Sequence, residues 1–186
     1  MEVLLLFYID GVSFVFEEID TWLYFLVFKK IKGTERKLFV GMLSKYVFRL
    51  SAIKERHRIS QVFILPTYQK SGHGKELIDT IYNISLNDPR CFEITTEIPS
   101  FEYQCLRDFK ELELILNSKI IDISLMKKVI NKTEIEENKA LLLTKENVRK
   151  IKEQLKIPGH QIERLINILI YHKIQSQNED MPKAYF

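Results

Sequence analysis

The sequence predicts an α+β protein with a mixed, mostly antiparallel sheet flanked by helices and with a C-terminal helical extension. The first half of the 186-residue chain holds four runs rich in aromatic and branched residues, at strand lengths. After Gly74 the apolar residues change to helical spacing, and one short apolar run interrupts them. The chain is also long enough to bury a core. We therefore expect a core over 1–116, a helical extension over 117–175 and a flexible tail over 176–186.

Turn residues separate the expected strands of the first half. They stand at Asp10-Gly11, at Lys32–Thr34 as a hairpin turn, and around Lys54–His57. The basic cluster Lys54–Arg58 is interpreted as a solvated turn. The expected strands are Val3–Ile9, Trp22–Ile31, Lys37–Leu50 and Arg58–Pro66.

The second part of the core should contain a helix, a short strand and a second helix. The helix that follows Gly74 is expected to stop at the turn Asn87–Pro89. A buried strand follows at Cys91–Glu97, and a helix begins near Ser100. One face of this second helix carries apolar residues and a thiol, Phe101, Cys105, Phe109 and Leu112.

Helices rich in Lys, Asn and Glu are expected from about residue 117 onward. Thr133 and Glu136 fit a capping box, in which each side chain satisfies a backbone N–H at the start of a helix. A turn at Pro158-Gly159 separates two apolar stripes that are too short for a coiled coil. The stripes consist of Val148, Ile151, Leu155 and of Ile162, Leu165, Ile166, Leu169, Ile170.

Composition bounds the class of protein. The net charge is only +3, from 28 Lys and Arg against 25 Asp and Glu, so no direct binding of nucleic acid is expected. No apolar run approaches the roughly 18 to 20 residues that span a bilayer, so we expect no membrane association. Two cysteines, Cys91 and Cys105, form no disulfide framework and are expected to be buried, inert thiols. We expect a soluble protein in the cytoplasm, the nucleus or both.

The segment Leu65–Tyr82, "LPTYQKSGHGKELIDTIY", places two of the six glycines either side of one histidine. Gln69, Gly72 and Gly74 fit the pattern Q-x-x-G-x-G between a strand and a helix. Successive backbone N–H groups and the helix dipole favour a diphosphate there, and glycine lets the backbone approach it closely. A Walker loop is excluded by its glycine and hydroxyl positions, and a dinucleotide fingerprint lacks its third glycine.

This loop resembles the acetyl-CoA loop of the GCN5-related N-acetyltransferase superfamily, Q/R-x-x-G-x-G/A. Over most of residues 3–172 the chain is similar to the catalytic subunit of type B histone acetyltransferase. That family runs S-Q-x-x-I-L-x-P-x-x-Q-x-x-G-H-G, then I-T-x-E-D-P-S, then L-R-D-F. The matching positions are Ser60, Gln61, Ile64, Leu65, Gln69, Gly72, His73, Gly74, Ile94, Thr95, Glu97, Pro99, Ser100, Leu106, Arg107, Asp108 and Phe109.

The resemblance implies that acetyl-CoA is the co-substrate and that no metal is used. Glu97 is the candidate catalytic base, and Asp20, near Trp22, matches a second acidic position; the alternatives are an exposed strand-end carboxylate and a solvated acidic turn. Tyr103 is a candidate proton donor to the leaving thiolate, or else a packing residue. The histidines and cysteines show no metal-ligand spacing. The implied cofactor-binding residues are Val62, Phe63, Ile64, Gln69, Lys70, Ser71, Gly72, His73, Gly74, Lys75 and Ser100.

The resemblance further implies acetylation of lysine ε-amines on free histones, with the histone-four tail as substrate and direct attack in a ternary complex. A WD-repeat histone chaperone is the implied partner. Two departures from the family stand out. The family's N-terminal domain is not included in this chain, which has either lost it or is a fragment, and the family's Glu-Asp pair is Glu97-Ile98 here. The alternatives are an N-acetyltransferase for another amine, or a degenerate module that binds CoA or histones without turnover.

Overall fold

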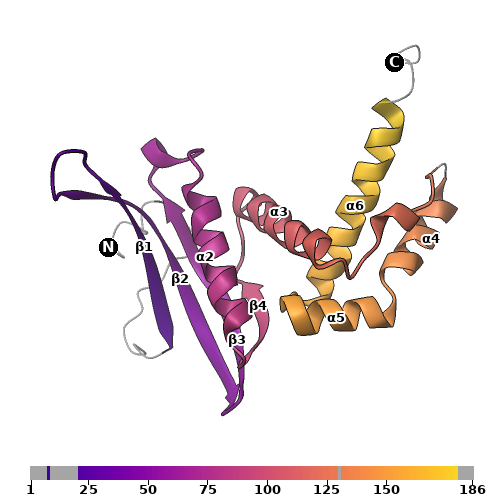
Figure 1. Ribbon diagram of the computed structural model, residues 1–186, viewed down its shortest axis with the longest axis horizontal. Helices are drawn as coiled ribbons and strands as arrows, with labels where there is room; N and C mark the ends of the chain where they lie inside the picture. The colour runs from indigo at the N-terminus through magenta and orange to yellow at the C-terminus, as the bar shows by residue number, and fades with distance from the viewer. Residues whose placement is uncertain (1–7, 9–20, 130, 180–186) are drawn as a thin grey trace. The chain divides into compact units, whose positions relative to one another are not determined.

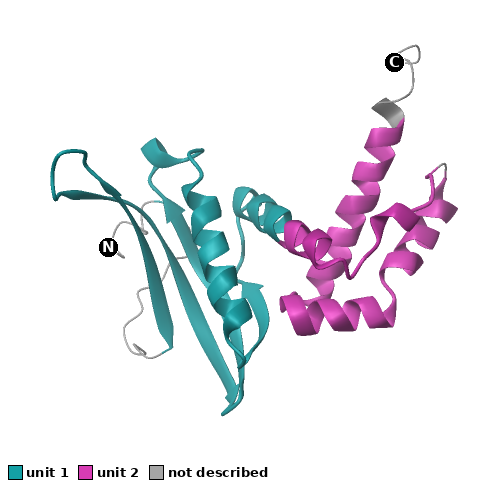
Figure 2. Ribbon diagram, viewed as in Figure 1, with its two compact units in different colours: residues 1–110 teal, residues 111–186 magenta. Residues whose placement is uncertain are grey.

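A computed structural model describes Tyr8 and residues 21–129 and 131–179 of the chain. It divides into two compact units, Met1–Lys110 and Glu111–Phe186, drawn in separate colours in Figure 2. The division falls within one helix, a few residues before the boundary expected at 116. The expected strand over 3–9, apart from Tyr8, and the turn Asp10-Gly11 lie outside the described residues.

Unit 1 is built on a four-stranded sheet in the order β1-β2-β3-β4. The first three strands pair antiparallel and β4 pairs parallel to β3, which confirms the predicted mixed, mostly antiparallel sheet (Figure 1). The predicted hairpin turn is present at Gly33, whose φ of 76° suits a residue without a Cβ. The strands are β1 Trp22–Lys30, β2 Lys37–Ser51, β3 Lys54–Ile64 and β4 Cys91–Thr96.

The segment Lys54–Arg58 was predicted to be a solvated turn, and this prediction is wrong. The segment is the first part of β3. Its side chains alternate between the two faces of the sheet, so Glu55 and His57 are buried while Arg56 and Arg58 are half-buried. The sequence did not indicate a strand here because its inward-facing positions are polar, so the alternation of apolar and polar residues that is typical of a strand is missing. Their burial is possible because partners from other elements satisfy them.

Helix α2 (His73–Asn87) covers one face of the sheet. Its apolar residues recur at helical spacing, as predicted, and Leu77, Ile78, Ile81 and Tyr82 are all buried. The short helix η1 (Pro66–Tyr68) lies in the connection between β3 and α2. The sheet and α2 therefore enclose the core of unit 1, and the loop between them emerges at one end of it (Figure 1).

Helix α3 (Phe101–Ser118) differs from expectation in the face that it buries. Phe101, Cys105 and Phe109 are exposed, so the expectation that both thiols are buried holds for Cys91 alone. Arg107 and Asp108 are buried instead. Their polar groups are satisfied, because Arg107 donates to the Ile94 carbonyl and Asp108 accepts from Gln104.

Unit 2 is helical and packs around its own apolar cluster, which includes Ile115, Ile151, Leu165 and Ile166. The capping box of its first long helix is formed by Asn131 and Glu134, not by Thr133 and Glu136. The helix therefore starts earlier than predicted. The elements are η2 Ile123–Leu125, α4 Lys132–Leu142, α5 Lys145–Leu155 and α6 Gly159–Glu179.

Helix α6 begins at the predicted turn and continues to Glu179, into the segment expected to be a flexible tail. Among the described residues, none of the helices combines the length and the apolar character that crossing a bilayer requires.

Candidate active site

A pocket of about 410 Å³ lies in unit 1, where β3 continues beyond the end of β4. β4 pairs with β3 only as far as Ile59 and Thr96, and the chain then turns away toward α3. The pocket thus combines backbone of one strand with side chains of the β4–α3 connection. It is lined by Tyr8, Ser60, Gln61, Val62, Thr96, Glu97, Ile98, Pro99, Ser100 and Tyr103.

Glu97, the predicted base, is the first residue after β4 and lines this pocket. Its backbone N–H donates to the Ile59 carbonyl at 2.9 Å, which extends the parallel ladder by one residue. Its side chain is exposed and accepts a hydrogen bond at Oε2 from Ser60 Oγ, with a distance of 2.5 Å between the two oxygens. A carboxylate held at a pocket wall in this way is suited to accept a proton from a bound amine.

Ile98 follows Glu97 with a φ of 33°, and 94% of its surface is exposed. A β-branched residue rarely adopts a left-handed conformation, so the backbone is strained at this position. Neither packing nor preferred geometry accounts for isoleucine here. The side chain that replaces the family's second carboxylate is an apolar group at the wall of the pocket.

The loop between β3 and α2 holds its shape through its own hydrogen bonds. The Gln69 side-chain amide donates to the Ile64 carbonyl at 3.0 Å, and Ser71 Oγ donates to the Gln69 carbonyl at 3.2 Å. Lys70 adopts a φ of 56°. The predicted glutamine therefore ties the loop to the last residue of β3, which is a structural role.

The two glycines of this loop have different reasons for lacking a side chain. Gly72 has a φ of 89° and is the residue before α2, so its conformation is the one that glycine adopts most readily. A Cβ at Gly74 would stand 3.2 Å from the Leu106 side chain of α3, so Gly74 permits close packing of two helices. Both reasons follow from the fold itself.

The N-terminus of α2 offers backbone donors. The first N–H groups of a helix have no intrahelical acceptor, and in α2 the first intrahelical bond runs from Glu76 to the Gly72 carbonyl. These groups and the helix dipole favour an anion at this end. His73 lies 3.5 Å from Glu76, measured from Nδ1 to the carboxylate.

Lys75 Nζ contacts Asp79 at 2.7 Å, and Lys110 contacts the same carboxylate at 2.7 Å. Burial raises the pKa of Asp79, but hydrogen bonds from Lys110 and Lys75 outweigh it and leave the pKa below its ordinary value.

The edge of β3 that faces away from β2 has no strand partner beyond Ile59 among the described strands. Val62, Phe63 and Ile64 lie on this stretch, where an extended ligand arm can add as a strand does. Val62 lines the pocket, whereas the Phe63 side chain is buried in a small cluster with Met42. Ser100 lines the pocket and accepts from the Tyr103 backbone N–H at 3.3 Å, as an N-cap of α3.

The pocket thus brings together Glu97, Val62, Ser100 and Tyr103 from the predicted set. Residues Gln69–Lys75 form a separate feature at the start of α2 and do not line it. Asp20 lies outside the described residues. Ser60, which the sequence offered only as part of a matching motif, is the residue that contacts the predicted base.

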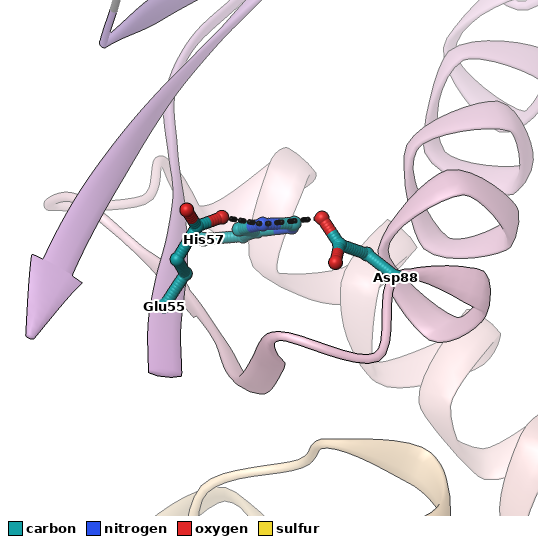
Figure 3. Close-up of side chains that lie close together, drawn as sticks. All are labelled: Glu55, His57 and Asp88. Atoms are coloured by element: carbon teal, nitrogen blue, oxygen red, sulfur yellow. Dashed lines mark ion pairs between the residues drawn. The ribbon is translucent and has the colours of Figure 1, made fainter. Parts of the chain in front are cut away.

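A second polar cluster was not expected from the sequence. The His57 imidazole lies between the carboxylates of Glu55 and Asp88, with Nε2 3.8 Å and 3.7 Å from their nearest oxygens (Figure 3). Nε2 has no hydrogen-bond partner in the described part of the chain. The three side chains come close enough to one another to hold a metal ion.

Charge balance argues against a metal at this cluster. Arg90 contacts Glu55 at 3.0 Å and Asp88 at 3.4 Å, and the Lys45 ammonium lies 3.2 Å from His57 Nδ1. Two cations therefore already neutralise the two carboxylates, and a divalent ion would add uncompensated positive charge in a buried place. We interpret the cluster as a structural charge network between β2, β3 and the α2–β4 turn.

Burial, followed by the Lys45 charge, lowers the pKa of His57 to about 4. The pKa of Lys45 is likewise lowered, mainly by burial. Burial raises the pKa of Asp88, but the hydrogen bonds and charge of Arg90 leave it below its ordinary value. The imidazole is therefore neutral at neutral pH.

Comparison with known proteins gives relatives of one kind. The chain is 28% identical to a histone acetyltransferase type B catalytic subunit of Cryptococcus neoformans over 189 residues, which cover 100% of this chain and 44% of that protein. It is 32% identical to one from Dictyostelium discoideum, over 93% of this chain and 34% of that protein. It is 30% identical to the human one, over 84% of this chain and 38% of that protein. The chain is thus homologous to these subunits along its length and spans less than half of each.

No protein-family model matches the chain. Among solved structures, an acetyltransferase of Trypanosoma brucei is similar over 42% of this chain and 54% of that chain, with 22% identity and a TM-score of 0.36. An aminoglycoside acetyltransferase from a soil metagenome is similar over 70% of this chain and 80% of that chain, with 17% identity and a TM-score of 0.37. These likenesses are partial, so the sequence relatives are the informative comparison.

Proposed function

We propose that this chain is an acetyl-CoA-dependent lysine N-acetyltransferase of the GCN5-related fold that acts on free histones, with Glu97 as its general base. One observation carries the proposal: Glu97 lines the same pocket as Val62 of β3, and its carboxylate accepts a hydrogen bond from Ser60 while its backbone N–H extends the sheet. Curated relatives named histone acetyltransferase type B catalytic subunit support the class of reaction and of substrate.

The reaction needs a neutral amine, whereas a free lysine is almost entirely protonated at pH 7. Glu97 accepts a proton from the ammonium group, directly or through a water, as the nitrogen attacks the thioester carbonyl. A nitrogen–carbon bond forms and the carbon–sulfur bond breaks. The CoA thiolate leaves and takes up a proton, for which Tyr103 in the pocket wall is the candidate donor.

The residues present fit the co-substrate. The edge of β3 at Val62–Ile64, which has no strand partner among the described strands, is suited to the pantetheine arm. The N-terminus of α2, together with the side chains of Lys70 and Lys75, is suited to the diphosphate. Gly72 leaves open space where a side chain would stand. Ser100 and Val62 both line the pocket.

The finer assignments belong to the same proposal. The histone-four tail is the proposed substrate, attacked directly in a ternary complex, and a WD-repeat histone chaperone is the proposed partner. Asp20 is the proposed second acidic residue.

The test is acetylation of free core histones, followed by mass spectrometry, with wild type and Glu97→Gln. We expect Glu97→Gln to lower kcat by about 10² to 10⁴-fold, the usual contribution of a positioned general base, with unchanged affinity for acetyl-CoA. Turnover of polyamines but not of histones would select another amine as substrate. Binding of acetyl-CoA without turnover of any amine would select the degenerate module, and full activity in Glu97→Gln would remove Glu97 as the base.

A further inference from the structure

We propose that Ser60 is a positioning residue that holds the Glu97 carboxylate in its reactive orientation, an inference that rests on the proposed function. Ser60 Oγ donates to Glu97 Oε2 at 2.5 Å, at the short end of the range for a hydroxyl–carboxylate hydrogen bond. Both residues line the same pocket. The contact joins positions 37 residues apart in the sequence.

The Glu97 side chain needs such a partner because it is exposed. A free glutamate side chain populates many rotamers and loses considerable entropy when it is held in one. In the described part of the chain, Ser60 is the side chain that provides a hydrogen bond to this carboxylate. Without it, the base would sample orientations that do not face the amine.

The donor itself stands on a rigid element. Ser60 is on β3 at a β-bulge, between Ile59 and Gln61, which both pair with β2. The neighbouring Ile59 carbonyl accepts from the Glu97 backbone N–H. Glu97 is therefore fixed to β3 twice, once through its backbone and once through its side chain. A site supported by strands in this way holds its geometry more precisely than a loop does.

The hydrogen bond leaves acceptor capacity on the carboxylate. Oε2 accepts from Ser60, and the remaining lone pairs of the two oxygens can take the proton of the amine. In this proposal Ser60 acts through Glu97 and not on the amine or the thioester. Its loss should therefore lower kcat and leave the KM of both substrates nearly unchanged, because misplacement of a catalytic group costs rate rather than binding.

The experiment compares Ser60→Ala, Ser60→Thr and a matched control, Ser124→Ala. Ser124 makes the same kind of bond, 2.6 Å from its Oγ to the Asp122 carboxylate, in unit 2. Ser60→Ala is expected to lower kcat by about tenfold or more, with KM within about twofold of wild type. Ser60→Thr keeps a hydroxyl and should restore most of the rate, and Ser124→Ala should leave it unchanged.

A double variant tests whether Ser60 acts through Glu97. Adding Ser60→Ala to Glu97→Gln should produce no further loss of kcat, because residues that act as one unit are not additive. An unchanged kcat in Ser60→Ala, or additive losses in the double variant, would overturn the proposal. So would equal losses in Ser60→Ala and Ser60→Thr when both variants unfold at the wild-type temperature.

A second measurement does not depend on turnover. In protein labelled with 13C in its glutamates, the Glu97 signal is identified by its absence from Glu97→Gln, and its side-chain relaxation is then measured. Ser60→Ala should make this side chain more mobile on the picosecond-to-nanosecond scale, and Ser124→Ala should not. If wild type turns over no amine, the proposed function fails, while this measurement still decides whether Ser60 holds Glu97; equal mobility in wild type and Ser60→Ala would overturn the inference.

Discussion

His57 is a fully buried imidazole with two carboxylates on one side and an ammonium group on the other. Its Nδ1 faces Ser85 Oγ at 2.8 Å, while its Nε2 reaches neither carboxylate at hydrogen-bond distance. Burial and the Lys45 charge keep it neutral and lower its pKa to about 4. Protonation of this residue therefore opposes folding.

The pH dependence of stability follows from this pKa. Between the ordinary histidine pKa of about 6.5 and the lowered value of about 4, the unfolded chain binds a proton that the folded chain does not, so stability rises with pH. We expect the free energy of unfolding to fall by about 2–3 kcal/mol through His57 between pH 7 and pH 4.5. Urea denaturation at several pH values measures this slope.

Two variants test whether His57 causes the change of the unfolding free energy with pH. His57→Asn should flatten the profile between pH 6.5 and pH 4.5, whatever its effect on absolute stability. Lys45→Met removes the second cause of the lowered pKa of His57, so this pKa should rise in the folded protein. The free energy of unfolding should then fall less between pH 6.5 and pH 4.5 than it does in wild type. The same slope in wild type and His57→Asn would contradict this account.

The connection between β3 and α2 is the element that links fold and proposed function. Gly72 and Gly33 are a natural pair for testing it, because both have positive φ and neither would meet another atom with an added Cβ. They differ in place, since Gly33 is in the β1–β2 hairpin turn and Gly72 precedes α2. A substitution at either position thus has the same local cost.

Gly72→Ala and Gly33→Ala should each lower the free energy of unfolding by about 1–2 kcal/mol, the cost of a left-handed conformation for a residue with a Cβ. Gly72→Ala should also weaken binding of acetyl-CoA by about tenfold, because a shift of the loop misdirects the N–H groups at the start of α2. Calorimetric titration with acetyl-CoA measures the difference. Equal affinities for acetyl-CoA in the two variants would mean that the loop before α2 does not bind the co-substrate.

At the scale of the whole molecule, the chain consists of two units with separate cores. The core of unit 1 is formed by the sheet and α2, with Ile78 fully buried, and that of unit 2 is a cluster of helical side chains, with Ile166 fully buried. Stability should therefore be lost locally when one core is damaged.

Ile78→Ala and Ile166→Ala should each cost about 2–5 kcal/mol, through lost burial and the cavity that remains. Hydrogen exchange followed by mass spectrometry should show faster exchange in residues 21–110 for Ile78→Ala and in residues 111–179 for Ile166→Ala. Faster exchange throughout the chain in both variants would mean that the two units unfold as one.

Much of the architecture could be predicted from short stretches of sequence. The aromatic and branched runs predicted β1, β2 and most of β3, and the change of period predicted α2. These patterns are local, since alternation and helical spacing are set by neighbours a few residues apart. The segment Gln69–Gly74 was placed correctly at the junction of a strand and a helix for the same reason, although α2 begins at His73 and so includes Gly74.

The errors occurred where partners distant in the sequence changed the outcome. Glu55 and His57 are charged or titratable, yet they are buried because Arg90 and Lys45 reach them. The exposed face of α3 was mistaken for its buried face because Arg107 finds its acceptor on β4. Helix α4 begins at Lys132 because the side chain of Asn131, the residue before it, caps it.

The sequence by itself determined the kinds of elements, their order, and the identity of Glu97 and of the glycine loop as candidates. Only the tertiary structure decided that Glu97 stands against Ser60, that both line one pocket, and that Gly74 faces Leu106. The physical reason is that helix and strand periods arise from near neighbours. The parallel pairing of β3 with β4, which aligns Ile59 with Thr96 and so brings Ser60 to Glu97, depends on the register of strands that a whole helix separates.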